Sequence, residues 1–311
     1  CSTCSVQRKY VKKLHECLPA LALYLTSCQM HFANEHPELR RKYEQLVASQ
    51  DRIGFFDQIW VQDILHPTWQ YLLNEQQVPI LRMPFVKKYG LKAYLQPLFL
   101  RSLPLLNALS RKEISYLEAN WFLHLNLQFT ESKEEFKNQG QYQKLYWDAG
   151  IEEIRKGYAD NHRRILKKAK NLELRPIEYQ CFQDFFIAQK GERLGNLTAS
   201  AWQRLAALVS AAKKMDQGMC FGVFDGSDLL AVGLFFRLEQ QLYFMKGTLN
   251  ERGKAVGALV FLIDAVLEQF ASECTTLDFV GSNQASIANF YRKFGAKDHY
   301  YQVLKGRWPF V

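Results

Sequence analysis

The sequence predicts a mixed α/β (α+β) protein built in two halves. Strand-like and helix-like patterns alternate along both halves, turn residues separate the patterns in the second half, and a polar run over residues 130–143 lies between the halves. We expect an N-terminal extension of uncertain structure at residues 1–38, a first domain at 39–145 and a second at 146–311. Each domain should contain its own mixed sheet flanked by helices, with a similar strand order, and the two domains should pack side by side.

The first half combines aromatic-rich and alternating segments. Aromatic residues are dense over residues 55–71, and polar and apolar residues partly alternate over 121–129. These patterns predict helices around residues 40–49 and 112–118, a pair of strands at 79–85 and 93–99, and a further strand at 121–129.

The second half shows a cleaner succession of elements. Gly226 lies in a polar turn between two apolar runs, and Thr198 is placed to cap a helix. In chain order we expect a helix at 150–171, a strand at 172–178, helices at 182–194 and 199–214, strands at 219–224, 229–237 and 241–248, a helix at 258–271, a strand at 276–280, a helix at 286–294 and a strand at 299–305.

The net charge fits an anionic partner, although solvated basic helices are common in soluble proteins and would give the same charge. The 311 residues carry a formal net charge of +9, which suits coenzyme A, a nucleotide-linked substrate or tRNA. No segment approaches the ~20 apolar residues of a membrane helix. The basic and apolar residues near the N-terminus imitate an export signal only faintly, because Glu16 and Pro19 interrupt the apolar run. We expect a cytoplasmic protein without a membrane span.

The seven cysteines follow neither a disulfide framework nor a complete zinc motif. Cys1 and Cys4 form a Cys-x-x-Cys pair, but no second pair follows at the spacing of a zinc knuckle. Cys181, Cys220 and Cys274 lie in apolar segments and are typical of small core residues. We expect no metal site and a reducing compartment.

A short segment before the apolar helix at 258–271 predicts an anion site. A turn rich in small residues that opens a helix offers free backbone N–H groups and the positive end of the helix dipole, which suits a pyrophosphate. The segment consists of Arg252, Gly253, Lys254, Ala255, Val256, Gly257 and Ala258. It predicts a donor with a nucleotide tail.

This segment, with Asn283, Tyr291 and Gly295 after it, resembles the acyl-CoA N-acyltransferase (GNAT) superfamily. The family's pyrophosphate loop runs Arg/Gln-x-x-Gly-x-Gly/Ala, and a later helix carries Asn…Phe-Tyr-x-x-x-Gly. Ala255 departs from the pattern, since the family usually has glycine there, and its Cβ could hold the backbone away from a phosphate. The order β-α-α-β-β-β-α-β-α-β in the second half also resembles the GNAT core.

The first half resembles the Fem-like branch of this superfamily, in which two GNAT-like domains occur in tandem and which is related to the peptidoglycan aminoacyltransferases. The likeness covers about residues 40–311. It rests on Trp60 and residues 80–84, 87–90 and 94–99, on the basic helix at 158–169, and on the strand end at 277–282.

The resemblance implies the roles of the site residues. Residues 252–258, listed above, and Lys246 would bind the donor, backbone groups at 245–248 on a splayed strand would polarise the thioester carbonyl, and Asn283 would position the donor arm. Tyr291 would be the general acid, although a half-buried core aromatic is the competing interpretation. Glu239 and Asp278 are possible bases, and neither is assigned.

The predicted function is N-acyltransfer, for example N-acetyltransfer, from acyl-CoA or another activated ester to a primary amine of a small-molecule or peptide-like acceptor. One alternative is an aminoacyl-tRNA-dependent peptidoglycan-precursor aminoacyltransferase. Another is a non-catalytic GNAT-fold binding module. A cationic helix face is more often solvated or paired with acidic residues than bound to RNA, and the remaining interpretations are an anionic substrate or donor and tRNA. No long heptad insertion appears in the second half, which disfavours tRNA. That face holds Arg163, Arg164, Lys167, Lys168 and Lys170. The oligomeric state is not predicted.

Overall fold

The structure is a computed structural model that describes residues 31–50, 53–88, 91–106, 109–119, 124–129, 138–148, 150–191, 197–281 and 283–305. Most of the expected N-terminal extension, with its Cys-x-x-Cys pair, lies outside the described residues. Within the described ranges, every helix is too short or too polar to cross a membrane.

A small antiparallel sheet begins the described chain. It consists of β1 (His31–Asn34), β2 (Trp69–Leu73) and β3 (Pro79–Pro84), in that order. Three helical segments lie between its first two strands in the chain: α2 (Pro37–Ala48), η1 (Phe55–Asp57) and α3 (Ile59–Leu65). Every residue of β2 and β3 is buried, so both faces of these strands are covered.

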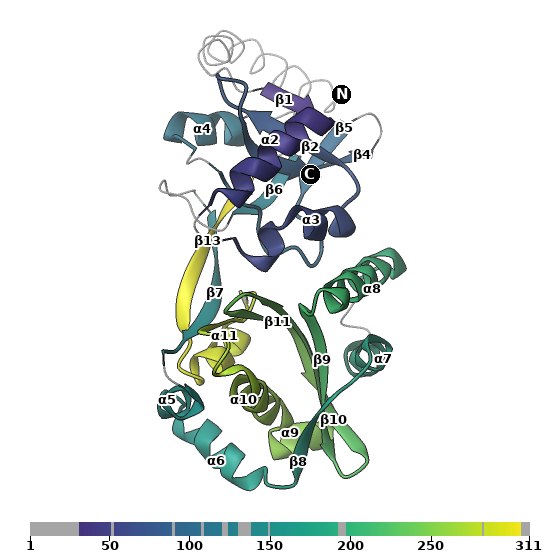
Figure 1. Ribbon diagram of the computed structural model, residues 1–311, viewed down its shortest axis with the longest axis vertical. Coiled ribbons are helices and arrows are strands. Elements are labelled where there is room, and N and C mark those ends of the chain that lie inside the picture. Colours follow the sequence, from purple (N-terminus) through teal and green to yellow (C-terminus); the bar gives the residue numbers. More distant parts are fainter. Residues whose placement is uncertain are drawn as a thin grey trace, which may run out of the picture.

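A ten-stranded mixed sheet joins the two halves of the chain. Its order is β4-β5-β6-β13-β7-β12-β11-β10-β9-β8. The first half contributes β4 (Val86–Lys88), β5 (Leu91–Leu95) and β6 (His124–Phe129). The last strand, β13 (Lys297–Lys305), pairs antiparallel with both β6 and β7 (Asn138–Tyr146) and runs with β7 between the upper and lower parts of Figure 1. The expectation of a separate sheet in each half is therefore wrong, while the domain boundaries stay a prediction.

Helices cover both faces of the second-half strands. The strands are β8 (Leu172–Pro176), β9 (Gly218–Asp225), β10 (Asp228–Leu238), β11 (Gln241–Leu249) and β12 (Thr276–Asp278). One face packs against α7 (Tyr179–Lys190) and α8 (Ala199–Lys214). The other packs against α10 (Ala258–Phe270), beside which lie α5 (Gly150–Lys156) and α6 (Asp160–Lys168) (Figure 1).

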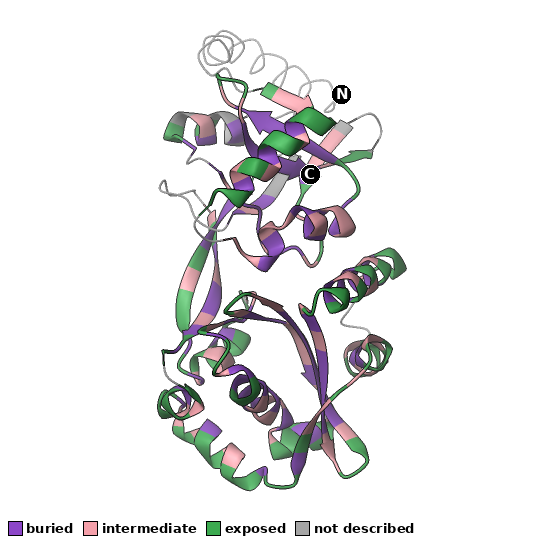
Figure 2. Ribbon diagram, viewed as in Figure 1, coloured by how far each residue is buried: buried purple, intermediate pink, exposed green. Residues whose placement is uncertain are grey.

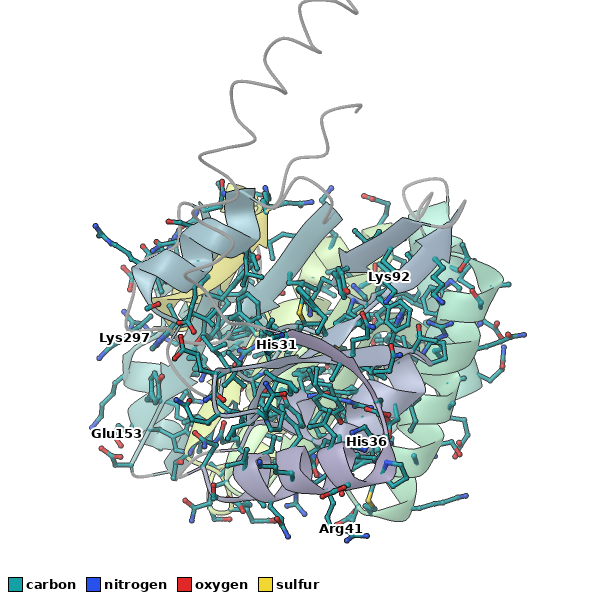
Figure 3. The ribbon with its side chains drawn as sticks, turned by 90° about the horizontal axis from the view of Figure 1, so that it is seen from above. His31, His36, Arg41, Lys92, Glu153 and Lys297 are labelled. Atoms are coloured by element: carbon teal, nitrogen blue, oxygen red, sulfur yellow. The ribbon has the colours of Figure 1, made fainter. Side chains whose placement is uncertain are left out.

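Two large hydrophobic clusters fill these layers. The first unites both halves: the ring of Phe55 stacks on Phe236 of β10 with centroids 4.3 Å apart. The second lies between the sheet and α10 and includes Phe235 and Phe244. Figure 2 shows the resulting buried strands between exposed helix surfaces. Because Phe55 stacks on Phe236, the first half packs directly on the sheet of the second. In the view of Figure 3, the charged side chains of Arg41 and Lys297 lie at the rim of the molecule.

Most expected elements are confirmed within a few residues, including α2, α8, α10 and α4 (Arg111–Ala119). Thr198 caps α8 as expected, since its hydroxyl accepts from the Ala201 N–H at 3.3 Å. The single helix expected at 150–171 is wrong. It divides into α5 and α6 because the Ala159 N–H donates to the Lys293 carbonyl at 2.8 Å, which turns the chain between them.

Two expectations for the first half also fail. The latter part of the polar run at 130–143 forms β7, in which Tyr142 and Gln143 are buried, while residues 130–137 lie outside the described ranges. The strands expected as a pair at 79–85 and 93–99 belong to different sheets, since β3 pairs with β2 and β5 pairs with β4 and β6. Local sequence patterns predict where strands lie along the chain, but they do not predict which strands pair.

Candidate functional site

The two central strands of the second half separate partway along their length. β11 and β12 run parallel and pair from Gln241 and Thr276 to Tyr243 and Asp278, where β12 ends. β11 continues to Leu249 with β10 as its partner. We call the point after Tyr243 and Asp278 the fork. Beyond it, one edge of β11 has no paired strand among the described residues, as expected for a splayed strand at 245–248.

Backbone groups on this open edge can be assigned from the ladder. The Asn250 N–H donates to the Leu230 carbonyl at 3.0 Å, on the β10 side. Hydrogen bonds alternate along an antiparallel ladder, so the N–H groups of Gly247 and Leu249 turn toward the open edge. Gly247 lies within the expected carbonyl-polarising segment, and its N–H is therefore the candidate donor there.

A β-bulge just beyond the fork directs side chains of β11 to different faces. The register shifts so that Leu234 pairs with Lys246 and Phe235 pairs with Phe244, which leaves Met245 as the extra residue. Phe244 packs in the cluster beneath α10, whereas Met245 packs against the cluster shared with the first half. Lys246 lies on that same side, with its Nζ 5.6 Å from the centre of the Phe99 ring.

A pocket of about 250 Å³ lies at the fork between the two halves. We call it the fork pocket; its lining includes Phe99, Arg101, Gln128, Lys246, Val280 and Asn283. Phe99 and Val280 both have positive φ, at 69° and 58°. This conformation is strained for a bulky or β-branched side chain, and such strain concentrates at functional sites. Two strained residues on the walls of one pocket mark it as the candidate reaction centre.

Two of the predicted site residues meet in the fork pocket. Asn283 is fixed there, because its Oδ1 accepts from the Gln141 N–H at 3.0 Å and its Nδ2 donates to the Tyr301 hydroxyl at 2.8 Å. Lys246 is half-buried, and burial lowers the pKa of its ammonium group. An amide and a lysine thus meet where a donor carbonyl would lie, and their roles stay predictions.

Tyr291 lies on the opposite face of β11. It belongs to α11 (Ala285–Arg292), and its ring stacks on Phe279 with centroids 4.1 Å apart and meets Phe244 edge-on at 6.3 Å. Burial raises the pKa of its hydroxyl. Tyr291 therefore lies next to the fork on the face of β11 opposite the fork pocket, in contact with Phe244, the residue before the splayed segment.

The predicted pyrophosphate turn is helical. Residues Glu251–Val256 form α9, and the Asn250 side chain caps it by accepting from the Gly253 N–H at 2.7 Å. The Arg252 guanidinium is paired with Asp225 and Asp228 in the turn between β9 and β10. Residues 252–256 are therefore helical where a turn was expected, and the role of residues 252–258 in binding a donor stays a prediction.

Free N–H groups occur instead at the start of α10. Within the described chain, no hydrogen bond reaches the N–H of Ala258 or Leu259, since the first bonds of α10 run from Val260 and Phe261 to the Gly257 carbonyl. Gly257 is needed here for two structural reasons. Its φ is +72°, and an added Cβ would lie 2.3 Å from the Ile165 side chain of α6.

The cationic residues lie in and just after α6, a helix that contacts this helix start. Arg163, Arg164, Lys167, Lys168 and Lys170 are all exposed. Arg163 is partly neutralised by Asp160, with which it pairs at 2.5 Å. Ile165, on the same helix, contacts Gly257 directly. Arg163 and Lys167 lie about 160° around the helix axis from Ile165, so the centre of the cationic face points away from the start of α10, and its use by an anionic ligand or tRNA stays a prediction.

A buried charge cluster at the fork escaped sequence reasoning. Arg101 from the first half pairs with Asp278, and the Lys144 Nζ lies 3.7 Å from the same carboxylate. Asp278, named above as a possible base, is 1% exposed and interacts with both cations. Glu239 lies exposed in the β10–β11 turn. The cluster joins residues more than 40 positions apart, and no local motif could reveal it.

A second pocket, of about 300 Å³, lies on the other side of Arg101. We call it the Asp57 pocket; its lining includes Asp57, Arg101, Tyr142, Lys144, Tyr243 and Asp278. The part of the chain that the structure describes contains no group of three or more His, Cys, Asp or Glu side chains placed to hold a metal ion.

Comparisons place this fold among known structures. No protein-family model matches the chain, and no match is found among curated proteins. Among solved structures, FemX is similar over 88% of this chain and 97% of its own, with 10% identity and a TM-score of 0.55. A tandem GNAT protein from the clavulanic acid biosynthesis pathway, solved without AcCoA, is similar over the same shares, with 11% identity and a TM-score of 0.52.

A conserved protein of unknown function from Bacteroides thetaiotaomicron is similar over 89% of this chain and all of its own, with 9% identity and a TM-score of 0.52. At such identities the likeness shows the fold. The chain has a GNAT-like fold over most of its length, which confirms the resemblance to the GNAT superfamily at that level.

Proposed function

We propose that this protein is an N-acyltransferase that moves an acyl group from acyl-CoA to a primary amine at the fork. The observation that supports the proposal most directly is the separation of β11 and β12 beside a strained pocket, within a GNAT-like fold. Its two halves are proposed to be tandem GNAT-like domains that share one sheet. The cysteine pattern supports a reducing compartment such as the cytoplasm.

The reaction requires little covalent chemistry from the protein. The amine nitrogen attacks the thioester carbonyl, a C–N bond forms, the C–S bond breaks, the nitrogen loses a proton and the thiolate gains one. The Gly247 N–H and the Lys246 ammonium would stabilise the negative charge on the carbonyl oxygen. Tyr291 would supply the proton to the sulfur, and Asn283 would hold the donor arm.

Donor phosphates are assigned to the start of α10. The free N–H groups of Ala258 and Leu259, at the positive end of a helix of 13 residues, suit a pyrophosphate better than Arg252, whose charge is already paired. This assignment keeps the predicted donor and changes which groups bind it.

Calorimetric titration with acetyl-CoA, followed by thiol release in the presence of an amine panel, tests the proposal. We expect saturable acetyl-CoA binding and amine-dependent release of free thiol. Absence of acetyl-CoA binding would contradict it.

The closed helix α9 favours a second candidate, a non-catalytic GNAT-fold module, because Arg252 and the Gly253 N–H already have partners. That module would bind a ligand without releasing thiol. The exposed cations of α6 keep an aminoacyl-tRNA donor as a third candidate. It would show as transfer from charged tRNA in the absence of acetyl-CoA binding.

A further inference from the structure

The Asp57 pocket has a construction that the proposed donor site does not explain. Its lining combines Asp57 from η1 in the first half with Tyr243 from β11 in the second. The Tyr243 hydroxyl accepts from the Phe55 N–H at 3.1 Å and donates to Gln241 at 3.0 Å, so its ring is fixed. Two further aromatic side chains, Tyr142 and Tyr146, line the pocket.

Two cations of this pocket have an anionic partner, whereas one of its carboxylates has no cationic partner among the described residues. Arg101 and Lys144 both interact with Asp278, and both lie over the face of the Tyr142 ring, at 4.5 Å and 5.4 Å from its centre. Asp57 differs from them. Its Oδ2 accepts from the Gly54 N–H at 2.8 Å, and within the described chain no cation lies within ion-pair distance of it.

Asp57 is a half-buried carboxylate that lines a cavity. Burial raises its pKa, and the nearby Asp278 adds to this effect, while the Gly54 N–H, Arg101 and Lys144 oppose it. Burying an unpaired carboxylate is costly, so a cation from outside the protein would offset a cost already present in the fold.

We propose that the Asp57 pocket binds an organic ammonium ion, which is the charged head group of the amine acceptor. The name acceptor rests on the proposed function, whereas the binding site does not. The pocket is lined by a carboxylate and by tyrosine rings, and these are groups that recognise an ammonium ion. Asp57 would repel an anionic ligand, and the two cations of the pocket are already engaged with Asp278.

The position of the pocket agrees with this assignment. Arg101 lines both the Asp57 pocket and the fork pocket, so ligands in the two pockets would be neighbours across one side chain. Asp278, which holds Arg101, is also the last β12 residue paired at the fork. An acceptor bound at Asp57 would therefore lie beside a donor bound at the fork.

The test uses three ligands of similar shape and different charge: 1-pentylammonium, 1-pentanol and pentanoate. Calorimetry on the full chain should show that pentylammonium binds more tightly than pentanol, and that pentanoate does not bind. Asp57→Asn should weaken pentylammonium binding by roughly tenfold or more, since hydrogen bonds to charged groups are worth about 1.5–3 kcal/mol. Glu75→Gln, which removes an exposed acid in the β2–β3 turn, is the matched control.

Gly54→Ala provides an independent steric variant. A Cβ at this position would lie 2.9 Å from the Asp57 Oδ2 and 3.4 Å from the Tyr243 hydroxyl, so it should weaken the same binding while keeping every charge. The unfolding midpoint of each variant reports whether it is folded.

The possible outcomes separate this inference from the proposed function. Equal pentylammonium affinity in the wild type and a folded Asp57→Asn variant, no pentylammonium binding by the wild type, or preference for pentanoate would overturn the ammonium site even if acetyl-CoA binds. If pentylammonium binding depends on Asp57 but the protein does not bind acetyl-CoA, the ammonium site is supported and the proposed acyltransferase function is contradicted.

Discussion

Tyr291 is the single residue on which the proposed chemistry depends most. If its hydroxyl protonates the leaving thiolate, Tyr291→Phe should lower turnover by about 10²–10⁴-fold and leave acetyl-CoA affinity nearly unchanged. The stacked contacts with Phe279 and Phe244 should keep the phenylalanine ring in place. Steady-state kinetics and calorimetry on the same preparation measure both effects.

Phe290→Leu, which changes the neighbouring aromatic without removing a hydroxyl, is the control for Tyr291→Phe. A folded Tyr291→Phe protein with full turnover would assign Tyr291 to the core. An aminoacyl-tRNA donor, whose leaving group is a ribose hydroxyl, would require the proton source to be assigned again.

Asp57 should reduce the stability of the unliganded protein. Its folded pKa is raised, so the folded state disfavours the charged carboxylate, and this penalty is present above the folded pKa and absent below the unfolded one. Asp57→Asn should therefore increase the free energy of unfolding at pH 8, and the gain should shrink toward pH 4. Urea unfolding at several pH values measures it.

Asp63 provides the contrast to Asp57. Its carboxylate pairs with the fully buried Arg82 at 2.6 Å, so Asp63→Asn should destabilise the protein at neutral pH. If both substitutions destabilise the protein at pH 8, the account of Asp57 is wrong.

His162 should make the protein acid-sensitive. Its side chain is 2% exposed, its ring lies 4.4 Å from that of Phe294, and neither ring nitrogen has a hydrogen bond of good geometry. Burial, with the charge of Lys293, lowers its pKa to about 4, and the nearby Phe290 carbonyl opposes this only weakly. The unfolded chain binds a proton near pH 6.5, so stability should fall from about pH 6.5 to pH 4, by about 3 kcal/mol.

The pH dependence of His162→Leu isolates this effect. The difference in unfolding free energy between variant and wild type should change over that same pH range, in favour of the variant at low pH. His31→Gln, at an exposed histidine of β1, should leave the pH profile unchanged. A variant with the wild-type profile would show that His162 does not titrate as described.

At the residue scale, the sequence located the side chains that belong to local patterns. Asn283 and Lys246 do reach the fork pocket, and both lie in segments with recognisable spacing. Arg101 and Asp57 could not be found in this way. Arg101 follows a segment without a chemical motif, and its role arises only when β12 places Asp278 beside it.

At the element scale, the end of α9 next to α10 offers a test of the proposed donor site. Ala255→Asp should weaken acetyl-CoA binding at least several-fold, because it adds a negative charge close to the start of α10 without filling buried space. Ala255→Gln, of similar size and without charge, should bind normally. Calorimetry measures both affinities. Equal acetyl-CoA affinity of the two variants would show that the donor phosphates do not bind at this end of α10.

Gly257→Asp is a weaker test of the same idea. The left-handed backbone of Gly257 and its contact with Ile165 make loss of folding the expected result. A loss of donor binding in that variant would therefore have two explanations, which Ala255→Asp separates.

Helix and strand positions were largely predictable where local signals agree. Thr198 ends one loop and begins α8, and apolar spacing defines α10. The errors occur where tertiary contacts override the local pattern. The Lys293 carbonyl breaks the helix expected at 150–171, and β7 lies within a polar run because β13 and β12 flank it on both edges.

At the scale of the whole molecule, the GNAT-like fold was predictable from the order of the elements, but the joining of the halves was not. That order says nothing of where the last strand pairs. β13 inserts between β6 and β7, so one sheet crosses the expected boundary near residue 145. Phe55 and Phe236 then place side chains of both halves in one core.

This shared core predicts that the described protein unfolds as one cooperative unit. Two independent domains would give two transitions, whereas a common sheet and a common core should give one, with equal calorimetric and van't Hoff enthalpies. Phe236→Ala should lower the midpoint of that single transition, since truncating a buried aromatic costs about 3–5 kcal/mol. Hydrogen exchange should show loss of protection in β2 and β3 of the first half as well as in β10. Loss of protection confined to the second half would indicate that the two domains unfold separately. The boundary near residue 145 would then divide two units of independent stability, although one sheet crosses it.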